Sequence, residues 1–251
     1  MPLIDTPFKR ISIDLIGPIK PKSTEGHQYI LTVMDYATGY PGAIALKEST
    51  AKEIAQSLMT VFSHVGIPEE ILTDQGHQFT ANYMKELKDT MNIKHLMSSP
   101  YHPMCNRLVE SFNGTLKHML IKLCIEQPHE WQKLIDPLLF AYRELPNETT
   151  GFSPLELVYG RNVRGLLQIL QKLWTGETFH DETRTTYEYV IKLRDTLETI
   201  MKRAQDNVAG AQRKHKFYYD KRTKSKDISP GDRVLKKILK KTSHMMTLLM
   251  N

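Results

Sequence analysis

The N-terminal stretch of the chain alternates between apolar and polar side chains in a way that predicts three β-strands joined as hairpins. In residues 11–16, isoleucine and leucine alternate with serine and aspartate, which is the pattern of a half-buried strand. Apolar runs at residues 29–34 and 42–46 predict two more strands, and Thr38-Gly39 marks the turn between them.

The apolar positions then change to helical spacing. Thr50 followed by Glu53 has the pattern of a capping box, and Gly66 is the expected end of the helix that begins there. Residues 70–73, with Ile71 and Leu72 at their centre, predict a fourth strand, which leads directly into an aspartate.

The rest of the chain alternates between helical and strand patterns. A helix capped by Thr80 and ending near Met91 is expected ahead of a fifth strand at residues 93–97. Further helices are expected at residues 106–126, 131–143, 154–159 and 182–219. Strands interleaved with helices predict an α/β fold in which helices cover a mixed sheet.

The helix expected at residues 106–126 has two different faces on a helical wheel. The apolar face is expected to pack on the core and consists of Leu108, Phe112, Leu116, Met119 and Leu123. The polar face consists of Glu110, Asn113, Gly114 and Lys117. Glu110 is therefore predicted to lie on the open side of this helix.

The formal net charge of +6 is unevenly distributed along the chain. Residues 1–175 hold 17 Lys and Arg against 18 Asp and Glu, whereas residues 176–251 hold 17 against 10. Residues 213–226 contain seven basic side chains and one acidic side chain. A basic C-terminal third indicates a polyanionic partner, although a solvated basic helix has the same composition.

The composition argues against several classes of protein. No apolar run reaches the length of a membrane span, and the first residues lack the features of a signal peptide. Cys105 and Cys124 form neither a disulfide framework nor a zinc-binding pair. A reducing compartment is therefore expected, with no membrane association and no small-molecule cofactor.

Three acidic residues stand where metal chemistry is expected. Asp14 lies in the first predicted strand, and Asp74 follows the fourth. Glu110 lies near the start of the helix expected at 106–126, and 35 residues separate it from Asp74. Carboxylates from two strand ends and a helix suit Mg²⁺ or Mn²⁺, and two such ions about 3.5–4 Å apart support phosphoryl transfer. Each residue alone also has a simpler interpretation, as a turn or cap residue for the aspartates and as a solvated side chain for Glu110.

A fourth acid competes for the first of these roles. Asp35 ends the second predicted strand, as Asp14 lies in the first. The sequence Tyr-Ala-Thr-Gly that follows Asp35 is typical of a hairpin turn. This favours a structural role for Asp35.

Several motifs together resemble one known family. They are Asp14 in the first strand, Thr73-Asp-Gln-Gly-His-Gln-Phe79, Tyr101-His-Pro103, Val109-Glu-Ser-Phe-Asn-Gly-Thr-Leu-Lys117, Ala141-Tyr-Arg143, Thr150-Gly-Phe-Ser-Pro154 and Pro230-Gly-Asp-Arg-Val234. With the spacing of the three acids, this set resembles the retroviral-type integrases, and more narrowly the integrase of gypsy-type LTR retrotransposons. The resemblance covers about residues 5–235.

The resemblance implies a ribonuclease-H-like fold, in which helices flank a five-stranded mixed sheet of order 3-2-1-4-5. It implies Asp14, Asp74 and Glu110 as the catalytic and metal-binding triad, with Mg²⁺ or Mn²⁺ as the cofactor. It also implies 3′-end processing of element DNA and transfer of those ends into target DNA. The protein is then expected to act as a homo-oligomer in the nucleus, or to lie in the cytoplasm before import.

The resemblance also implies four residues as DNA contacts: Lys117, Asn113, Arg107 and His102. Lys117 lies two helical turns beyond Glu110 on the same face. His77 and His102 are expected to be structural or to line the DNA rather than to bind metal. Gly76 is expected to allow the turn after Asp74 through a positive φ angle.

The sequence departs from the family pattern beside Glu110. Pro103-Met-Cys-Asn-Arg-Leu-Val-Glu-Ser111 lacks the Gln, Thr, Gly and Arg that are usual there, which bears on DNA positioning more than on metal binding. The expected domains are a catalytic core at 1–165, a helical extension with a basic end at 166–222, and a truncated remnant of the C-terminal barrel at 223–251, with no N-terminal zinc module.

Two other functions fit the same residues. A retroelement-derived protein that binds DNA or another protein without catalysis needs the fold but not the metals. A nuclease that acts on RNA–DNA hybrids shares the fold and the triad, but the motifs beyond the triad favour the integrase.

Overall fold

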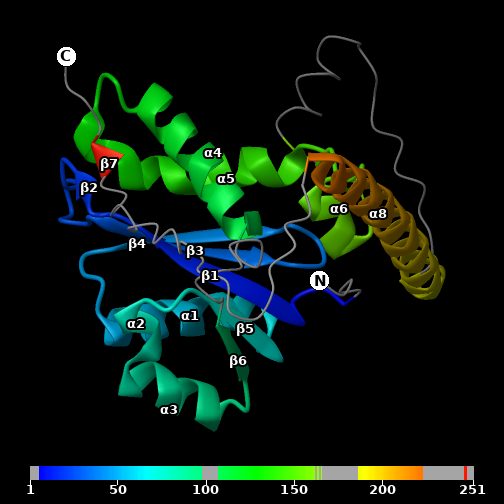
Figure 1. Cartoon of the computed structure of the whole chain (residues 1–251), viewed down its shortest axis with the longest axis horizontal. Helices are drawn as coiled ribbons and strands as arrows, with labels where there is room; N and C mark the ends of the chain where they lie inside the picture. Colours follow the sequence, from blue (N-terminus) through cyan, green and yellow to red (C-terminus); the bar gives the residue numbers. More distant parts are fainter. Residues whose placement is uncertain are drawn as a thin grey trace, which may run out of the picture.

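The structure is a computed structural model that describes residues 6–97, 107–161, 163, 165, 186–222 and 246–247. Its centre is a sheet of five strands in the order β4-β3-β1-β5-β6 (Figure 1). The strands are β1 (Arg10–Ile16), β3 (Tyr29–Asp35), β4 (Pro41–Leu46), β5 (Glu70–Thr73) and β6 (Lys94–Met97). The two-residue strand β2 is not part of this sheet, so the sheet strands in chain order are β1, β3, β4, β5 and β6. Numbered one to five in that order, they lie as 3-2-1-4-5, which is the predicted order, and the ribonuclease-H-like architecture is confirmed.

The sheet is mixed, as predicted. β1 runs antiparallel to β3, and β3 runs antiparallel to β4, whereas β5 is parallel to both β1 and β6. Ile13 pairs with Val33 across the first of these ladders. The strand β3, which lies between β4 and the central strand β1, is almost wholly buried because helices cover both of its faces.

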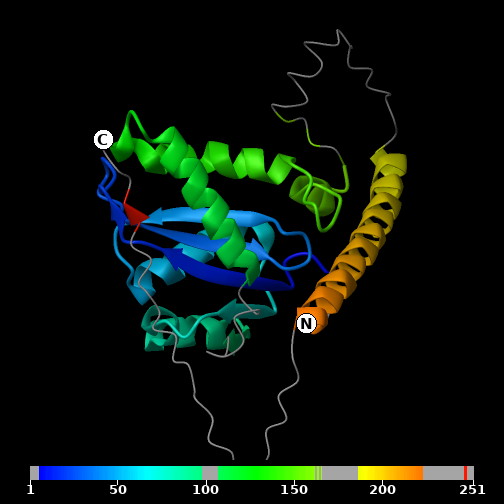
Figure 2. The same cartoon turned by 45° about the horizontal axis from the view of Figure 1, so that its top comes forward.

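Helices form a layer on each face of the sheet (Figure 2). One layer holds α1 (Ala51–Val65), α2 (His77–Thr80) and α3 (Asn82–Thr90). The other holds α4 (Arg107–Leu123), the 3-10 helix η2 (Pro128–Leu134) and α5 (Ile135–Glu144). Each layer has its own core, with Phe112 and Trp131 fully buried on the α4 side and Phe79 on the α1 side.

Thr50 caps α1 as predicted, but the capping box is only half formed, because the Glu53 carboxylate accepts from the Lys47 and Glu48 N–H groups instead. The Thr50 side chain accepts a hydrogen bond from the Glu53 backbone N–H at 3.4 Å. Gly66 ends the helix with a φ of 89°, and its N–H donates to the Phe62 carbonyl. That φ angle is one that residues with a Cβ rarely adopt.

The predicted cap of the next helix is wrong. Thr80 is the last residue of α2, and its hydroxyl donates to the His77 carbonyl at 3.2 Å within the same turn. Ala81 is the residue that precedes α3, and it provides no side-chain hydrogen bond. Its extended backbone separates the predicted single helix into α2 and α3.

Two further differences concern local geometry. The helix expected at residues 131–143 starts earlier, at Pro128, as the 3-10 helix η2, and becomes α-helical only at Ile135. The short strand β2 (Ile19–Lys20) pairs in parallel with β7 (Met246–Thr247), and neither strand is predicted by the sequence pattern.

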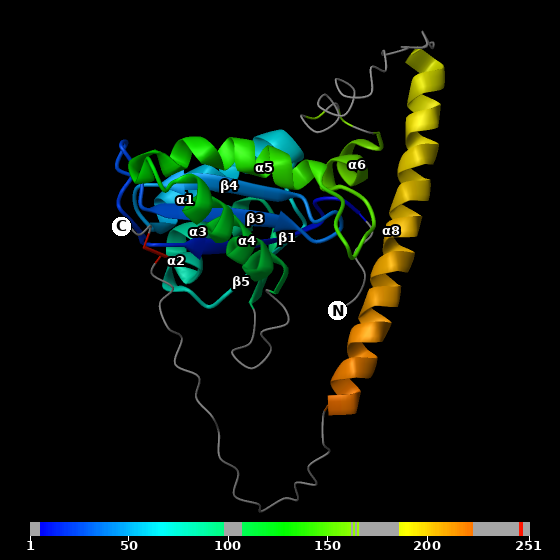
Figure 3. The same ribbon diagram turned by 90° about the horizontal axis from the view of Figure 1, so that it is seen from above.

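A long helix, α8 (Thr186–Arg222), lies beside α6 (Pro154–Tyr159) at one edge of the domain (Figure 3). Asn207 Nδ2 donates to the Thr150 carbonyl at 2.8 Å, and Ala204 is buried. The helix expected at 182–219 is thus confirmed over its described residues, whereas the predicted domain division stays a prediction. Within the described ranges, no helix is long and apolar enough to span a membrane.

Candidate metal and nucleic-acid site

Asp14 and Asp74 occupy equivalent places on neighbouring strands. β1 and β5 are parallel, and the last pair in their register joins Ser12 to Leu72. Each aspartate lies two residues beyond its member of that pair, so both stand at the same level, Asp14 within β1 and Asp74 just after the end of β5. Alternate residues of a strand share a face, so Asp14 is on the same face of the sheet as Ser12. Asp74 follows Leu72 by the same two residues.

The chain folds tightly after Asp74. The Gly76 N–H donates to Asp74 Oδ1 at 2.8 Å, which holds the carboxylate against its own backbone. The expected positive φ is wrong, since Gly76 has a φ of −58°. Glycine is needed there for space instead, because a Cβ atom would lie 2.8 Å from Asp74 Oδ1 and 2.5 Å from Gln78 Nε2.

Asn113 ties α4 to β1 at Asp14. Its Nδ2 donates to Asp14 Oδ2 at 2.9 Å, and the residue is only 6% exposed. The prediction of Asn113 on an open polar face is therefore wrong. The buried face of α4 instead contains Val109, Phe112, Asn113, Leu116 and Leu120, and Leu123 of the predicted packing face is exposed.

Among the residues that the structure describes, the second polar atom of the Asn113 side chain has no partner. Oδ1 is buried and makes no hydrogen bond, which costs free energy in a folded protein unless a further group approaches it. An orphaned carbonyl oxygen next to an aspartate is an electronegative position. It suits a cation or a water molecule that a cation holds.

Glu110 and Lys117 flank Asn113 on α4. Glu110 lies one turn before Asn113 and is exposed, as predicted, and Lys117 lies one turn after it. Burial lowers the pKa of Lys117, while the negative charge of Asp14 opposes that shift. The ammonium of Lys117 therefore lies within the electrostatic reach of Asp14. Arg107, the first residue of α4, is exposed one turn before Glu110.

Asp35 is a structural residue, as its turn sequence indicates. It is fully buried and accepts hydrogen bonds from the Phe8 N–H, the Thr38 N–H and the Thr38 hydroxyl at 2.9, 2.9 and 2.6 Å. Desolvation by burial raises the pKa of Asp35, and these hydrogen bonds oppose the shift. Thr38 lies in the hairpin turn that follows Asp35, whereas Phe8 lies in the segment before β1, so Asp35 ties that segment to the turn.

The three predicted ligands are brought near one another but not into a tight cluster. Among the residues that the structure describes, no group of three or more His, Cys, Asp and Glu side chains could hold a metal ion. Asp14 and Asp74 lie at the same level of neighbouring strands, and Glu110 lies one helical turn from Asn113, which contacts Asp14. The donors fit a hard cation by type, because Mg²⁺ takes carboxylate oxygens and keeps water as its other ligands.

His102, one of the predicted DNA contacts, lies outside the described residues.

His95, Lys88 and Thr73 form a hydrogen-bonded group beside Asp74 that the sequence does not predict. Only the position of Thr73 next to Asp74 could have indicated it, because His95 and Lys88 come from other elements.

Comparison with known proteins identifies the domain. Residues 5–103 match the family described as the integrase core domain. The chain is 31% identical over 154 residues to the Pro-Pol polyprotein of feline foamy virus, covering 61% of this chain and 13% of the relative. It is 26% identical over 239 residues to the Pol polyprotein from transposon 412 of Drosophila melanogaster, covering 94% of this chain and 19% of the relative.

The chain contains a retroviral-type integrase core domain. It spans only 13% and 19% of the length of these two relatives. Solved integrase structures share its fold. An intasome of simian T-cell lymphotropic virus, in complex with PP2A regulatory subunit B56 gamma, superposes with a TM-score of 0.57 at 20% identity, over 74% of this chain and 63% of that one. The HTLV-2 integrase catalytic core domain, in complex with magnesium in a trimeric form, gives 0.50 at 22%, over 60% and 95%.

One of the family motifs has a structural role in this integrase core. Arg143, from the motif Ala141-Tyr-Arg143, donates from Nε and from its terminal nitrogen to the Pro41 carbonyl at 2.9 and 2.7 Å. Its guanidinium carbon also lies 4.3 Å from the centre of the Tyr40 ring. These contacts hold α5 against β4.

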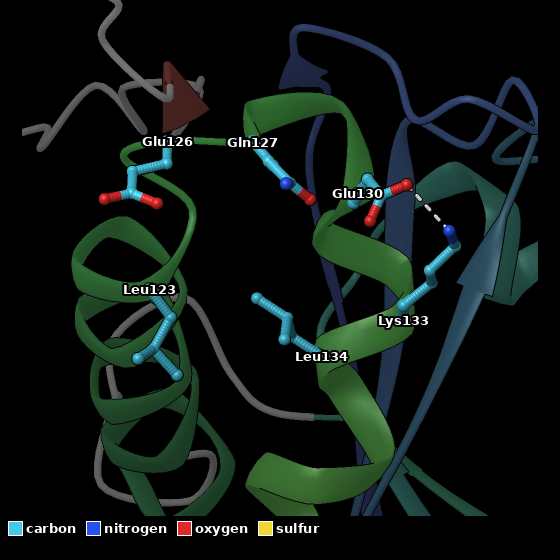
Figure 4. Close-up of a pocket in the computed structure, with 6 residues that line it drawn as sticks. All are labelled: Leu123, Glu126, Gln127, Glu130, Lys133 and Leu134. Atoms are coloured by element: carbon cyan, nitrogen blue, oxygen red, sulfur yellow. Dashed lines mark hydrogen bonds and ion pairs between the residues drawn. The ribbon is translucent and has the colours of Figure 1, made fainter.

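A hollow in the integrase core lies away from the triad. It is lined by Leu123, Glu126, Gln127, Glu130, Lys133 and Leu134, between the end of α4 and η2 (Figure 4). Lys133 and Glu130 form an ion pair of 2.7 Å at its edge. Leu123 stands thirteen residues after Glu110 on α4, which is about 20 Å along a helix. The hollow is therefore separate from the candidate metal site.

Proposed function

We propose that this chain is an integrase-type polynucleotidyl transferase that acts on DNA with divalent metal ions. The observation that carries the proposal is the placement of Asp14 and Asp74 at the same level of adjacent parallel strands, with α4 held onto Asp14 by Asn113. Glu110 lies one helical turn from that contact. The membership of the integrase core domain family supports the same activity.

The proposed reaction has two steps. A water molecule first attacks a phosphodiester near the end of element DNA, and the bond from phosphorus to the 3′ oxygen breaks, which frees a 3′-hydroxyl. That hydroxyl then attacks a phosphodiester of target DNA, and the 3′ oxygen of the target strand leaves as the new bond forms. Two divalent cations, when bound, supply activation of the attacking oxygen and stabilisation of the leaving oxygen. Asp14, Asp74 and Glu110 would hold these cations through their carboxylates.

The other polar residues of α4 are proposed to orient a metal ligand and to bind DNA. Asn113 orients the Asp14 carboxylate through its 2.9 Å hydrogen bond. Lys117 is half-buried near Asp14 and is placed to bind a DNA phosphate beside the reacting one. Arg107 adds an exposed positive charge at the start of the helix, and His102 is proposed to line the same DNA.

The proposed partners are DNA and further copies of the chain. The exposed end of α8, around Arg213, Lys214 and Lys216, carries a positive charge suited to the phosphate backbone. The solved neighbours are an intasome and a magnesium-bound trimeric core domain, which supports a homo-oligomer and Mg²⁺ or Mn²⁺ as the cofactor. We place the activity in the nucleus, with the cytoplasm as the site before import.

A second candidate function is DNA or protein binding without catalysis. It is favoured by one observation: the described side chains do not form a group of three metal ligands. A chain that retained the fold of a retroelement integrase and lost the chemistry would still present the basic end of α8.

Incubation of the purified chain with a branched DNA oligonucleotide and Mg²⁺ or Mn²⁺ distinguishes the two functions. The transferase is expected to cut and rejoin the oligonucleotide only when metal is present, and Glu110→Gln is expected to abolish the products. Salt-sensitive DNA binding with no products under any metal condition would instead support the binding protein. Products that Glu110→Gln leaves unchanged would show that the triad is wrongly assigned.

A further inference from the structure

A chain of polar contacts runs from α3 across β6 to the end of β5. Lys88 Nζ lies 2.7 Å from His95 Nδ1, and it also donates to the Phe79 carbonyl at 3.3 Å. His95 Nε2 lies 2.8 Å from Thr73 Oγ1. The Thr73 hydroxyl in turn lies 2.7 Å from the Asp74 carbonyl oxygen. The contacts thus end on the backbone of a proposed metal ligand.

The donor and acceptor properties of these groups set the direction of each hydrogen bond from Lys88 to Asp74. The Asp74 carbonyl only accepts, so it takes the single proton of the Thr73 hydroxyl. His95 Nε2 must then carry a proton and donate it to Thr73 Oγ1. The charged ammonium of Lys88 donates to Nδ1, which selects the neutral imidazole with its proton on Nε2.

Lys88 is an unusual residue to find inside a domain. It is 5% exposed, and within the described part of the chain no carboxylate forms an ion pair with it. Desolvation lowers its pKa, and also lowers that of His95, which favours the neutral ring. A buried ammonium without a carboxylate partner reduces stability. Packing alone therefore does not account for Lys88 and His95.

The hydrogen bonds of His95 and Thr73 lie at the point where the pairing of β5 with its neighbouring strand ends. The described ladder between β5 and β6 ends at the pair Thr73–Met97, and Asp74 is the next residue. From there, the Thr73 hydroxyl holds the Asp74 carbonyl and the Gly76 N–H holds Oδ1. The direction of the Asp74 carboxylate thus depends on the Thr73 hydroxyl, which His95 orients.

We propose that His95 is a positioning residue for Asp74, acting through Thr73, with Lys88 selecting its tautomer. The inference rests on the proposed function, in which Asp74 is a metal ligand. Groups that orient a ligand from behind typically change metal affinity by about 10–100-fold when they are removed.

Direct binding of Mn²⁺ to the full chain, measured by calorimetry, tests this proposal. His95→Leu and Thr73→Val remove the hydrogen bonds with little change in volume, and each is expected to weaken Mn²⁺ binding by about 10–100-fold. Thr73→Ser keeps the hydroxyl, and His95→Gln keeps an N–H near the position of Nε2. Both are expected to remain within about threefold of the unchanged chain.

Two controls separate positioning from a general loss of structure. Leu58→Ala removes a buried side chain of α1 that is outside these contacts, and it is expected to lower the Tm without weakening Mn²⁺ binding. The imidazole ¹⁵N NMR spectrum of His95 is expected to show a proton on Nε2 and none on Nδ1. A proton on Nδ1 would overturn the proposed direction of the contacts.

The outcomes distinguish this inference from the proposed function. If His95→Leu and Thr73→Val bind Mn²⁺ as strongly as the unchanged chain, the positioning role of His95 is overturned and the metal site is not. The positioning role is also overturned if Mn²⁺ affinity falls in proportion to the loss of Tm in every variant, including Leu58→Ala. Absence of Mn²⁺ binding in the unchanged chain would overturn both the metal site and the inference built on it.

Discussion

Asn113 and Asp14 are 99 residues apart in the sequence and are joined by a 2.9 Å hydrogen bond from the amide Nδ2 to the carboxylate Oδ2. This contact is a polar link between the sheet that carries two of the proposed ligands and the helix that carries the third, and it adds to the apolar packing of α4 on the sheet. Within the described part of the chain, it leaves Asn113 Oδ1 buried without a partner. Asn113 therefore helps to set the position of Glu110 relative to Asp14.

Replacement of Asn113 by alanine is expected to weaken Mn²⁺ binding by about 10–100-fold, because Asp14 loses the donor that orients it. The unfolding free energy should change by only about 1 kcal/mol, since the substitution also removes the orphaned oxygen. Calorimetry and urea unfolding measure the two quantities. Asn207→Ala removes a comparable amide contact on α8 and should leave Mn²⁺ binding intact. Equal affinity in Asn113→Ala and the unchanged chain would refute the link.

Lys117→Gln is expected to weaken DNA binding for all sequences alike, because a phosphate contact carries no sequence information. The slope of log affinity against log salt concentration should fall by about 1. Fluorescence anisotropy over a series of salt concentrations measures this slope. Lys52→Gln is the matched control, because Lys52 is exposed on α1 at the opposite face of the sheet. If both variants lower the slope equally, Lys117 has no special place on the DNA.

Gly76→Ala is expected to reduce metal-dependent cleavage, because the new methyl group would lie 2.8 Å from Asp74 Oδ1 and displace it. The backbone itself is not strained, since φ is −58°. The matched control is Gly114→Ala on α4, where a Cβ meets nothing within 4 Å. That control should retain activity and gain about 0.5–1 kcal/mol of stability from helix propensity. Full activity in Gly76→Ala would show that the turn does not position Asp74.

The ion pair between Arg10 and Glu70 predicts a pH dependence of stability. Hydrogen bonding to Arg10 lowers the pKa of Glu70 below its ordinary value of 4.5, and their side chains are 13% and 16% exposed. Because the folded-state pKa is depressed, the stabilisation is present above pH 4.5 and is lost as pH falls through the folded-state value.

Glu70→Gln should therefore cost about 1–3 kcal/mol of unfolding free energy near neutral pH, and this difference should vanish in strong acid. Urea unfolding at a series of pH values measures it. Glu69→Gln serves as the control, because Glu69 is 71% exposed and its pair with Lys9 spans 3.6 Å. A difference between Glu70→Gln and the unchanged chain that persists in acid would contradict the assignment to this ion pair.

Periodicity and capping residues are sufficient to predict most of the sheet and its covering helices. The apolar run of β3 reflects the burial of both of its faces under helices. The half-buried strand predicted from the alternation in β1 is wrong, because Ser12 and Ile16 are buried as well as Ile11 and Ile13. Thr80 fails as a cap because its hydroxyl bonds back to His77 within its own turn, a choice that sequence does not reveal. The pair β2–β7 depends on residues more than 200 positions apart, and its two-residue strands have no recognisable period.

The sequence predicts the three acidic residues of the candidate site, but it does not predict the side chains that contact them. The spacing of Asp74 and Glu110 marks the residues, but the burial of Asn113 follows from how α4 rotates on the sheet. A helical wheel places polar residues outside, and it cannot anticipate an amide that is buried to hold a carboxylate. His95 and Lys88 escaped notice for the same reason, since only the folded sheet brings them to Thr73.

Anomalous diffraction from a crystal of the full chain soaked in Mn²⁺ measures whether Asp14, Asp74 and Glu110 bind divalent metal together. We expect an anomalous peak within ordinary Mn–O bonding distance of Asp14 and Asp74, with Glu110 drawn in to complete the site. A crystal of Glu110→Gln should show a weaker peak or a shifted one. A peak away from both aspartates, or none at saturating Mn²⁺, would rule out this shared metal site.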